Sequence, residues 1–327
     1  MKKVLVTGAG GFIGSNLTEA LVLEGCEVTA FLHYNSRSDF GNLDFIDPSI
    51  LKNIRILRGD VQDYQTVRRA VTGQDTVMHL AALIAIPYSY HAPESYVRTN
   101  VLGTLHVLQA CLDENVSTVI HTSTSETYGT ALYTPIDEDH PLQGQSPYSA
   151  SKIGADKIAE SFFRSFDLPV ATIRPFNTYG PGQSARAIIP TIISQALTTK
   201  DNTIKLGLLT PVRDLTFVKD TVQGYIAIGK KRTSIGRVVN IGTGSGITIG
   251  DLAGKIIMQI NPGITIKSDK KRERPEKSEV MELICNSQAA GELLGWHPVY
   301  SLDDGIAETI NFIKKNLDFY KPQLYAI

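Results

Sequence analysis

A glycine-rich turn between a short apolar strand and a helix constrains the fold more than any other feature. Residues 3–7 have the pattern of a buried strand, and residues 12–24 carry apolar side chains at helical spacing. Glycines spaced three apart allow a tight turn, close approach of the backbone to a pyrophosphate, and close packing of helix on strand. The helix N-terminus favours the phosphates because its N–H groups are free. The predicted cofactor contacts of this turn are Gly8, Gly11, Phe12, Ile13 and Gly14.

The same alternation of strand and helix continues through the first half of the chain. Strands are expected at residues 27–33, 54–58, 76–81 and 118–122, and helices at 63–71 and 94–114. Val-, Ile- and Leu-rich strands separated by helices indicate parallel pairing through right-handed crossovers. We therefore predict an α/β fold with a doubly wound parallel (Rossmann) sheet. An eight-fold barrel is the alternative, but it requires similar units up to the end of the chain.

The 327 residues suggest about two domains. The regular rhythm ends near Pro175, and residues 237–241 look like one further buried strand. We predict that residues 1–175 form the dinucleotide-binding domain and that 214–242 return to it. Residues 176–213 and 243–327 then form a smaller C-terminal α/β substrate region.

Composition excludes several classes of function. Lys plus Arg number 32 and Asp plus Glu 33, which argues against binding mainly to nucleic acid or to an anionic membrane. The three cysteines are few and widely spaced, which suits a reducing cytoplasm and excludes a disulfide scaffold or a cysteine-rich metal site. No run of 18 apolar residues occurs. We predict a cytoplasmic protein with no membrane segment and no metal.

The residues after the second strand bear on the choice of cofactor. An NAD site usually has a carboxylate there for the ribose 2′-hydroxyl. This chain has Asn35, Ser36 and Arg37 instead, and no carboxylate before Asp39. Arg37 and Ser36 can hold a 2′-phosphate through charge-assisted hydrogen bonds. The sequence favours NADP over NAD.

Tyr148 and Lys152 lie four residues apart, on one face of a helix that Pro147 can start. An ammonium beside a phenol stabilises phenolate, so we expect a lowered tyrosine pKa and a general base. A polar cluster from His121 to Gly129 follows the strand at 118–122. Its side chains are predicted at the carboxyl edge of the sheet, where open α/β folds bind ligands.

These motifs together carry a family resemblance. The glycine turn, Thr124-Ser125-Glu126, Tyr148 to Lys152 and residues 174–181 occur in the order found in the extended short-chain dehydrogenase/reductases that modify nucleotide sugars. Residues 135–138, 144–148 and 183–186 more narrowly resemble the NDP-N-acetylglucosamine 4,6-dehydratases of legionaminic- and pseudaminic-type sugar pathways. The resemblance covers nearly the whole chain.

The resemblance implies a three-step reaction. Tyr148, assisted by Lys152 and Thr124, takes the proton of the sugar 4-hydroxyl while C4 loses a hydride. Glu126 removes the C5 proton, water leaves from C6, and the hydride returns to C6. Ser125 replaces an Asp that acts as the acid in dTDP-glucose dehydratases, so the acid at C6 is open: Glu126 acting twice, or a water.

The resemblance also implies further contacts. Those to the cofactor come from Asp60, Val61, Ala81, Ala82, Asn100 and Thr122 as well as Tyr148 and Lys152. Those to the nucleotide sugar come from Tyr88, Asn177, Arg186, Arg213 and Arg274. A homodimer through a four-helix bundle is expected by analogy.

The implied activity is NADP-dependent 4,6-dehydration of UDP-N-acetylglucosamine, or of its GDP counterpart. UDP-glucuronate decarboxylase and nucleotide-sugar C4 epimerase are the enzyme alternatives, since decarboxylases share Thr-Ser-Glu. The epimerase is disfavoured because it has no use for Glu126 at C5. A dinucleotide-sensing protein without catalysis is the alternative from another class.

Overall fold

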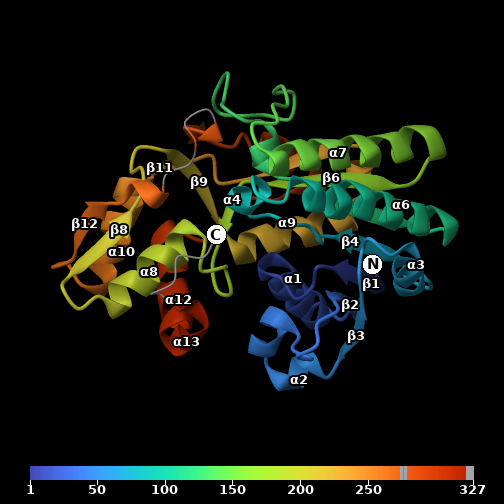
Figure 1. Cartoon of the computed structure of the whole chain (residues 1–327). Helices are drawn as coiled ribbons and strands as arrows, with labels where there is room; N and C mark the ends of the chain where they lie inside the picture. The colour runs from blue at the N-terminus through green and yellow to red at the C-terminus, as the bar shows by residue number, and fades with distance from the viewer. Residues whose placement is uncertain (273–274, 276–277, 322–327) are drawn as a thin grey trace.

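A seven-stranded parallel sheet forms the centre of the larger region (Figure 1). The computed structural model describes residues 1–272, 275 and 278–321. The strand order is β10-β6-β5-β4-β1-β2-β3. The strands are β1 (Lys3–Thr7), β2 (Glu27–His33), β3 (Ile54–Gly59), β4 (Thr76–His79), β5 (Thr118–Thr122), β6 (Val170–Pro175) and β10 (Val238–Ile241). This open order confirms the doubly wound fold and rules out the barrel.

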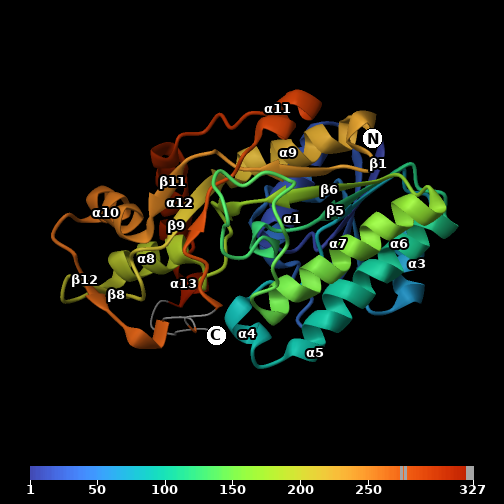
Figure 2. The same cartoon turned by 90° about the horizontal axis from the view of Figure 1, so that it is seen from above.

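Helices cover both faces of this sheet, as a doubly wound fold requires. One face carries α1 (Phe12–Leu23) and α9 (Val218–Lys230), which pack on each other. The other carries α3 (Tyr64–Val71), α6 (Gly103–Asp113) and α7 (Pro147–Phe166), which lie side by side in Figure 2. Val4 and Val6 belong to the core on the first face and Leu5 to the core on the second. Alternating side chains of one buried strand therefore serve two apolar layers.

The helix expected at 94–114 is not one regular α-helix. It consists of α5 (Pro93–Tyr96), a π-helical segment η2 (Val97–Leu102) and α6. Apolar periodicity could not reveal this, because a π segment adds one residue to a turn without changing the amphipathic character of the helix. Such segments occur frequently at functional sites. In this chain the segment carries Asn100, whose side chain is fully buried.

The smaller region is built around short strands. In it β9 (Val212–Phe217) pairs with β7 (Asn177–Tyr179), β11 (Gly246–Thr248) and β13 (Glu282–Leu283). A second pair joins β8 (Thr203–Leu206) and β12 (Thr265–Ser268). The helices of this region are α8 (Ile188–Thr198), α10 (Ile249–Ile260), α12 (Leu302–Lys315) and α13 (Leu317–Tyr320). Helix α11 (Gln288–Leu294) packs instead on β10 and α9 of the larger region.

Segment 214–242 is shared between the two sheets. Strand β9 lies in the small sheet, whereas α9 packs on β5 and β6 of the large one. Strand β10 pairs in parallel with β6 at the edge of the large sheet. The domain boundaries drawn from the sequence stay a prediction.

Short elements complete the described chain. They are η1 (Gly41–Phe45), α2 (Pro48–Leu51), α4 (Ile86–Ser89), η3 (Ser125–Thr127), η4 (Arg232–Ser234) and η5 (Lys270–Arg272). None of the helices formed by the described residues is both long and apolar enough to cross a bilayer.

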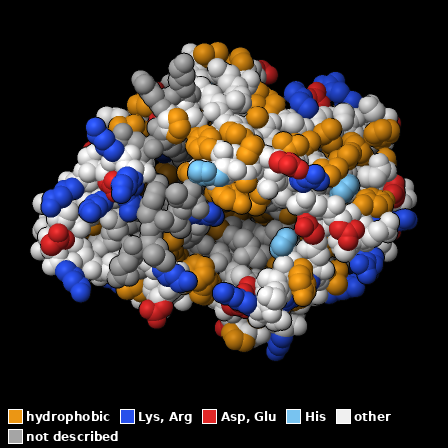
Figure 3. Space-filling view, viewed as in Figure 1, with side chains coloured by type: hydrophobic (Ala, Val, Ile, Leu, Met, Phe, Trp, Pro, Cys, Tyr) orange, Lys and Arg blue, Asp and Glu red, His pale blue; other side chains and the backbone are white. Residues whose placement is uncertain are grey.

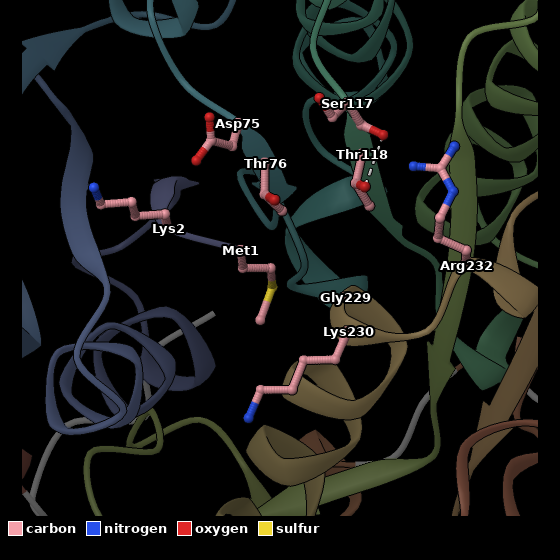
Figure 4. A pocket seen from close by; sticks show the side chains of 9 residues that line it. All are labelled: Met1, Lys2, Asp75, Thr76, Ser117, Thr118, Gly229, Lys230 and Arg232. Carbon is pink, nitrogen blue, oxygen red and sulfur yellow. Dashed lines mark hydrogen bonds between the residues drawn. The ribbon is translucent and has the colours of Figure 1, made fainter.

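The molecular surface is hollowed between the larger and smaller regions (Figure 3). A separate depression lies at the amino ends of β1, β4 and β5 (Figure 4). It is lined by residues such as Lys2, Asp75 and Arg232. Because open α/β sheets bind ligands at the carboxyl ends of their strands, the hollow of Figure 3 lies where a ligand is expected.

Candidate active site

The glycine turn has the geometry expected of a phosphate-binding turn. Gly8 has a φ of +72°, and a Cβ there would lie 2.8 Å from the amide nitrogen of Ala81. A Cβ on Gly14 would overlap the carbonyl oxygen of Gly8. Gly11 precedes α1, and no side chain caps the N-terminus of that helix. The first N–H groups of α1, at Phe12, Ile13 and Gly14, are therefore free to receive a pyrophosphate.

An arginine of the neighbouring strand β3, which the sequence did not indicate, holds the loop after β2 in place through hydrogen bonds to its carbonyls. Arg58 of β3 donates to the carbonyls of Asn35 (3.3 Å) and Ser38 (2.8 Å). The Asn35 side chain in turn accepts from the backbone N–H of Arg37 over 3.1 Å. The side chains of Ser36 and Arg37 are exposed. The loop is thus ordered while its cation stays accessible to a ligand.

The residues predicted to contact adenine follow β3. Asp60 lies 3.5 Å from His33 at the end of β2, and Val61 is buried. Val61 packs tightly against Gly103 at the start of α6, where a Cβ would lie 2.8 Å from its methyl group. These contacts fix the carboxyl ends of β2 and β3 beside the loop that carries Arg37.

A buried hydrogen-bond chain joins the glycine turn to the π segment. Thr104 donates to the carbonyl of Asn100 (2.6 Å), so its oxygen must accept from Nε2 of His79 (3.0 Å). Nδ1 of His79 then accepts from the hydroxyl of Thr7 (2.8 Å), which itself accepts from the amide of Ala81 (3.2 Å). Burial lowers the pKa of His79 well below 6.5, which keeps its ring neutral. These hydrogen bonds position Ala81, and beside it Ala82, next to Gly8.

Tyr148 and Lys152 lie on the buried face of α7. Ser146 and Ser149 form a capping box, and Pro147 is the first residue of the helix, as expected. Tyr148 is 7% exposed and Lys152 is 4% exposed. Nζ of Lys152 donates to the carbonyl of Thr122 at the end of β5 over 2.6 Å. The hydroxyl of Thr122 accepts from Tyr225 of α9 over 2.9 Å, a contact that the sequence did not indicate.

The expected lowering of the Tyr148 pKa is wrong for the chain on its own. Burial raises the pKa of the phenol, and the charges of Glu126 and Asp156 raise it further. A hydrogen bond with Thr124 acts in the opposite direction. Burial lowers the pKa of Lys152 to about 8, although the charge of Asp156 raises it. Desolvation, which sequence spacing cannot reveal, outweighs the pairing of the two groups.

The 3₁₀ turn η3 (Ser125–Thr127) begins shortly after the end of β5. Thr124 caps this turn by accepting from the amide of Glu126 over 3.3 Å. Ser125 is 2% exposed, whereas Glu126 is half-buried. The turn η3 that carries Glu126 packs against α7, and the charge of Glu126 acts on the Tyr148 phenol. Thr124, Glu126, Tyr148 and Lys152 are therefore brought together at the carboxyl end of β5.

A polar cluster behind Lys152 was also missed. The carboxylate of Asp156 accepts from Nε2 of His121 (2.9 Å), Oγ of Ser123 (2.6 Å) and the guanidinium of Arg174 (2.9 Å). All four side chains are at most 7% exposed. The one available signal was that Asp156 lies four residues after Lys152. His79 and His121 are packed in the core, and the described part of the chain has no group of three His, Cys, Asp or Glu suited to a metal.

Three of the predicted substrate contacts, Tyr88, Arg186 and Asn177, are described by their surroundings. The ring of Tyr88 lies 6.3 Å from that of Tyr96, which lies 6.2 Å from Tyr148. The charge of exposed Arg186 lowers the pKa of Tyr96, although burial raises it more. Nδ2 of Asn177, at the start of β7, is buried without a hydrogen-bond partner among the residues that the structure describes. A buried amide in that state suits a ligand contact, because leaving it unmet is unfavourable.

The two remaining predicted contacts are placed differently. Arg213 of β9 is 7% exposed, and its guanidinium lies 3.0 Å from the carboxylate of Glu279. Its orientation toward a diphosphate stays a prediction. Arg274 lies outside the described residues.

The family model for GDP-mannose 4,6 dehydratase matches residues 5–309. The chain belongs to this family. The match spans the glycine turn, the Thr124–Glu126 turn and the Tyr148–Lys152 pair. It confirms the resemblance to extended short-chain dehydrogenase/reductases that modify nucleotide sugars, and with it an enzyme of the dehydratase type.

Relatives within this family differ in the reaction that they catalyse. The dTDP-glucose 4,6-dehydratase of Streptomyces antibioticus is 32% identical, over 98% of this chain and 94% of its own. The structure of TunA, an NAD-dependent NDP-hexosamine 5,6-dehydratase of tunicamycin biosynthesis, is 29% identical with a TM-score of 0.84, covering 96% and 98% of the two chains. The UDP-N-acetylglucosamine 4-epimerase of Methanobrevibacter ruminantium M1 is 27% identical with a TM-score of 0.87, covering 96% and 99%. All of them act on nucleotide sugars, as their names state.

Proposed function

We propose that this enzyme catalyses the NADP-dependent 4,6-dehydration of UDP-N-acetylglucosamine, with the GDP sugar as a variant. The product is the 4-keto-6-deoxy sugar nucleotide. The observation that carries this proposal is the packing of η3, which holds Glu126, against α7, which holds Tyr148; the charge of Glu126 acts on the phenol. Two proton acceptors at one edge of the sheet suit a reaction that removes protons from O4 and from C5 in turn.

In the first step Tyr148 takes the proton of the sugar 4-hydroxyl. Thr124 hydrogen-bonds the phenol, and Lys152 supplies a positive charge one helical turn away. The nicotinamide, when bound, supplies a positively charged ring that accepts a hydride from C4 and later returns it to C6. Ala81 and Asn100 lie on the segments that would hold this ring, because the His79 chain ties both to the glycine turn.

In the second step Glu126 removes the C5 proton, which the 4-ketone has made acidic. The C5 electrons form a double bond to C6 as the 6-hydroxyl leaves. Glu126 now carries a proton and gives it to the departing oxygen, so that water is released. When the hydride returns to C6, C5 takes up one proton from solvent, and Tyr148 releases to solvent the proton that it took from O4. The net change is the loss of one water. We assign the acid at C6 to Glu126 because Ser125, at the position of the usual Asp, is 2% exposed and has no acidic proton to give.

The preference for NADP rests on the loop after β2. Arg37 and Ser36 are exposed there, and Arg58 holds the loop in place through the carbonyls of Asn35 and Ser38. A guanidinium and a hydroxyl suit a 2′-phosphate. TunA is NAD-dependent by its name, so the proposed preference for NADP distinguishes this chain from that relative.

The N-acetylglucosamine nucleotide is proposed from the resemblance of residues 135–138, 144–148 and 183–186 and is supported by the names of two relatives. One acts on an NDP-hexosamine and the other on UDP-N-acetylglucosamine. Asn177, with its unpartnered amide, and Arg186, near Tyr96, are the groups that we assign to this substrate.

The test is to incubate purified protein with NADP and each of UDP-N-acetylglucosamine, GDP-N-acetylglucosamine and UDP-glucuronate, and to measure product masses. Loss of one water from an N-acetylglucosamine nucleotide supports dehydration. Loss of carbon dioxide from UDP-glucuronate indicates a decarboxylase. A product of unchanged mass with altered retention indicates C4 epimerisation, the reaction of the epimerase relative, and turnover of none contradicts the proposal for these substrates.

A homodimer and a cytoplasmic location belong to the same proposal. Helices α6 and α7 lie side by side on one face of the sheet, and hydrophobic side chains gather over them in Figure 3. Exposed Val97 and Phe166 lie at the ends of this surface. Pairing of these helices with their copies would form the four-helix bundle.

A further inference from the structure

The catalytic helix α7 carries three ionisable side chains in one line. Tyr148, Lys152 and Asp156 are spaced four residues apart, which places them on the same face. All three are at most 7% exposed. Only the first two have a part in the proposed mechanism, so the buried carboxylate at the inner end of the line requires an explanation.

Asp156 is held as an anion by donors from two neighbouring strands. Burial acts to raise its pKa, but the hydrogen bond from His121 and the charges of Arg174 and Lys152 outweigh burial and lower the pKa. Burial lowers the pKa of His121, so the ring is neutral and donates through Nε2. Nδ1 of His121 is then an acceptor, and none of the described residues donates to it.

Arg174 is fully engaged within the same cluster. Its guanidinium donates to Ser123 (3.1 Å), Tyr128 (2.7 Å) and Asp156 (2.9 Å). Lys152 makes one hydrogen bond, to the carbonyl of Thr122. Other groups around Lys152 are neutral His79 on β4 and Tyr225 on α9, which bonds Thr122, while Glu126 acts on Tyr148 from η3. Among these neighbours Asp156 is the one whose charge acts on Lys152.

We propose that Asp156 is a positioning residue that keeps the buried Lys152 protonated, so that the Lys152 ammonium can stabilise the Tyr148 phenolate. Burial alone favours the neutral amine, which can no longer support a phenolate. Asp156 also disfavours the phenolate directly. That effect acts across two helical turns, about 12 Å of rise, whereas Lys152 acts across one. In this proposal the indirect effect through Lys152 outweighs the direct effect of Asp156.

This inference rests on the Tyr148–Lys152 base of the proposed function and is tested on the hydride-transfer step. The rate of cofactor reduction is measured against pH with whichever of the three sugar nucleotides is turned over. In the unchanged protein the rate falls as pH rises through the pKa of Lys152, because the neutral amine loses its stabilising charge. Asp156→Asn is expected to move this alkaline limb to lower pH by about one unit, which is about a tenfold lower rate on the limb.

Ser123→Ala is the matched control, because it removes one hydrogen bond from the same carboxylate and leaves its charge. We expect no displacement of the limb in this variant, and restoration of the limb in Asp156→Glu. A limb that stays in place in Asp156→Asn, with only a uniformly lower rate, overturns the inference and indicates a purely structural carboxylate. A limb displaced equally in Ser123→Ala also overturns it.

Lys152→Arg provides a second measurement if Asp156→Asn does not fold. An arginine stays charged at all relevant pH values, so the alkaline limb must disappear from whatever activity is left. Persistence of the limb at the same pH shows that it does not report position 152 and contradicts the inference. Absence of turnover of all three sugars by the unchanged protein contradicts the proposed function instead.

Discussion

Asn100 donates a hydrogen bond of 2.9 Å from Nδ2 to the hydroxyl of Ser151, joining the π segment η2 to the catalytic helix α7. Ser151 passes this constraint on by donating to the carbonyl of Tyr148 over 2.7 Å. Asn100 also accepts from the amide of Leu83 (2.8 Å) and donates to its carbonyl (3.0 Å). One buried amide thus positions Tyr148 relative to the segment after β4.

Replacing Asn100 with Ala should therefore be costly. The change leaves the backbone groups of Leu83 and the hydroxyl of Ser151 with fewer partners inside the protein. We expect the free energy of unfolding to fall by about 1–3 kcal/mol, measured by denaturant titration. Arg98→Ala, in the same π segment but with an exposed ion pair to Glu94, should cost about 0–1 kcal/mol. Equal losses in the two variants would contradict the positioning role.

Replacing Gly14 with Ala should abolish tight cofactor binding. The new methyl group would overlap the carbonyl of Gly8, so the turn and the N-terminus of α1 must move apart. We expect NADP affinity, followed by fluorescence titration, to fall at least about tenfold, the effect of about 1.4 kcal/mol. Gly254→Ala on α10 meets no atom within 4 Å and should raise stability by up to about 1 kcal/mol. Unchanged affinity in Gly14→Ala would remove the turn from the cofactor site.

Replacing Arg37 with Asp should change cofactor preference. A carboxylate there repels a 2′-phosphate and can accept from a free 2′-hydroxyl. The affinity for NADP relative to NAD should fall by about tenfold or more, as expected for loss of one charge-assisted hydrogen bond. Arg55→Asp makes the same charge change at an exposed position of β3 and should leave the ratio as it is. An unchanged ratio in Arg37→Asp would exclude this side chain from the cofactor account.

Acid should destabilise the fold through its buried histidines. The folded protein holds the pKa of His79 well below 6.5, mainly by burial, so the unfolded chain binds its proton first as pH falls. This stabilisation is complete above pH 6.5 and declines below it, by about 1.4 kcal/mol per pH unit for one proton. His79→Asn should flatten the dependence of unfolding free energy on pH by that amount. His91→Asn changes an exposed position and serves as the control. Equal slopes of unfolding free energy against pH in the unchanged protein and in both variants would refute the role assigned to His79.

The sequence predicts six of the seven strands of the large sheet, because each of the six is a short apolar run with a local turn signal; strand β6 was not predicted. Strands β1, β2 and β5 begin and end at the predicted residues. The carboxyl-edge rule then places Thr124 and Glu126 near Tyr148, since β5 and α7 are neighbours of β6. Local sequence patterns were sufficient to predict the position of a residue when that position depends on a single strand or helix.

Contacts between distant elements could not be predicted in this way. Arg58 supports the cofactor loop from a different strand, and Asp156 collects donors from β5 and β6. The direction of the Tyr148 pKa shift depends on burial by several elements at once. None of these features produces a recognisable residue spacing in the sequence, because they arise from tertiary packing between distant elements.

The most direct test of the central claim is a single turnover of Glu126→Gln with UDP-N-acetylglucosamine and NADP. The amide cannot take the C5 proton, so C4 oxidation should proceed while elimination stops. We expect the absorbance of reduced nicotinamide to rise and persist, with no product lighter by one water. Glu94→Gln, at an exposed position of α5, should turn over normally. Complete turnover of Glu126→Gln, with loss of water at the rate of the unchanged enzyme, would contradict the assignment of Glu126 as the C5 base.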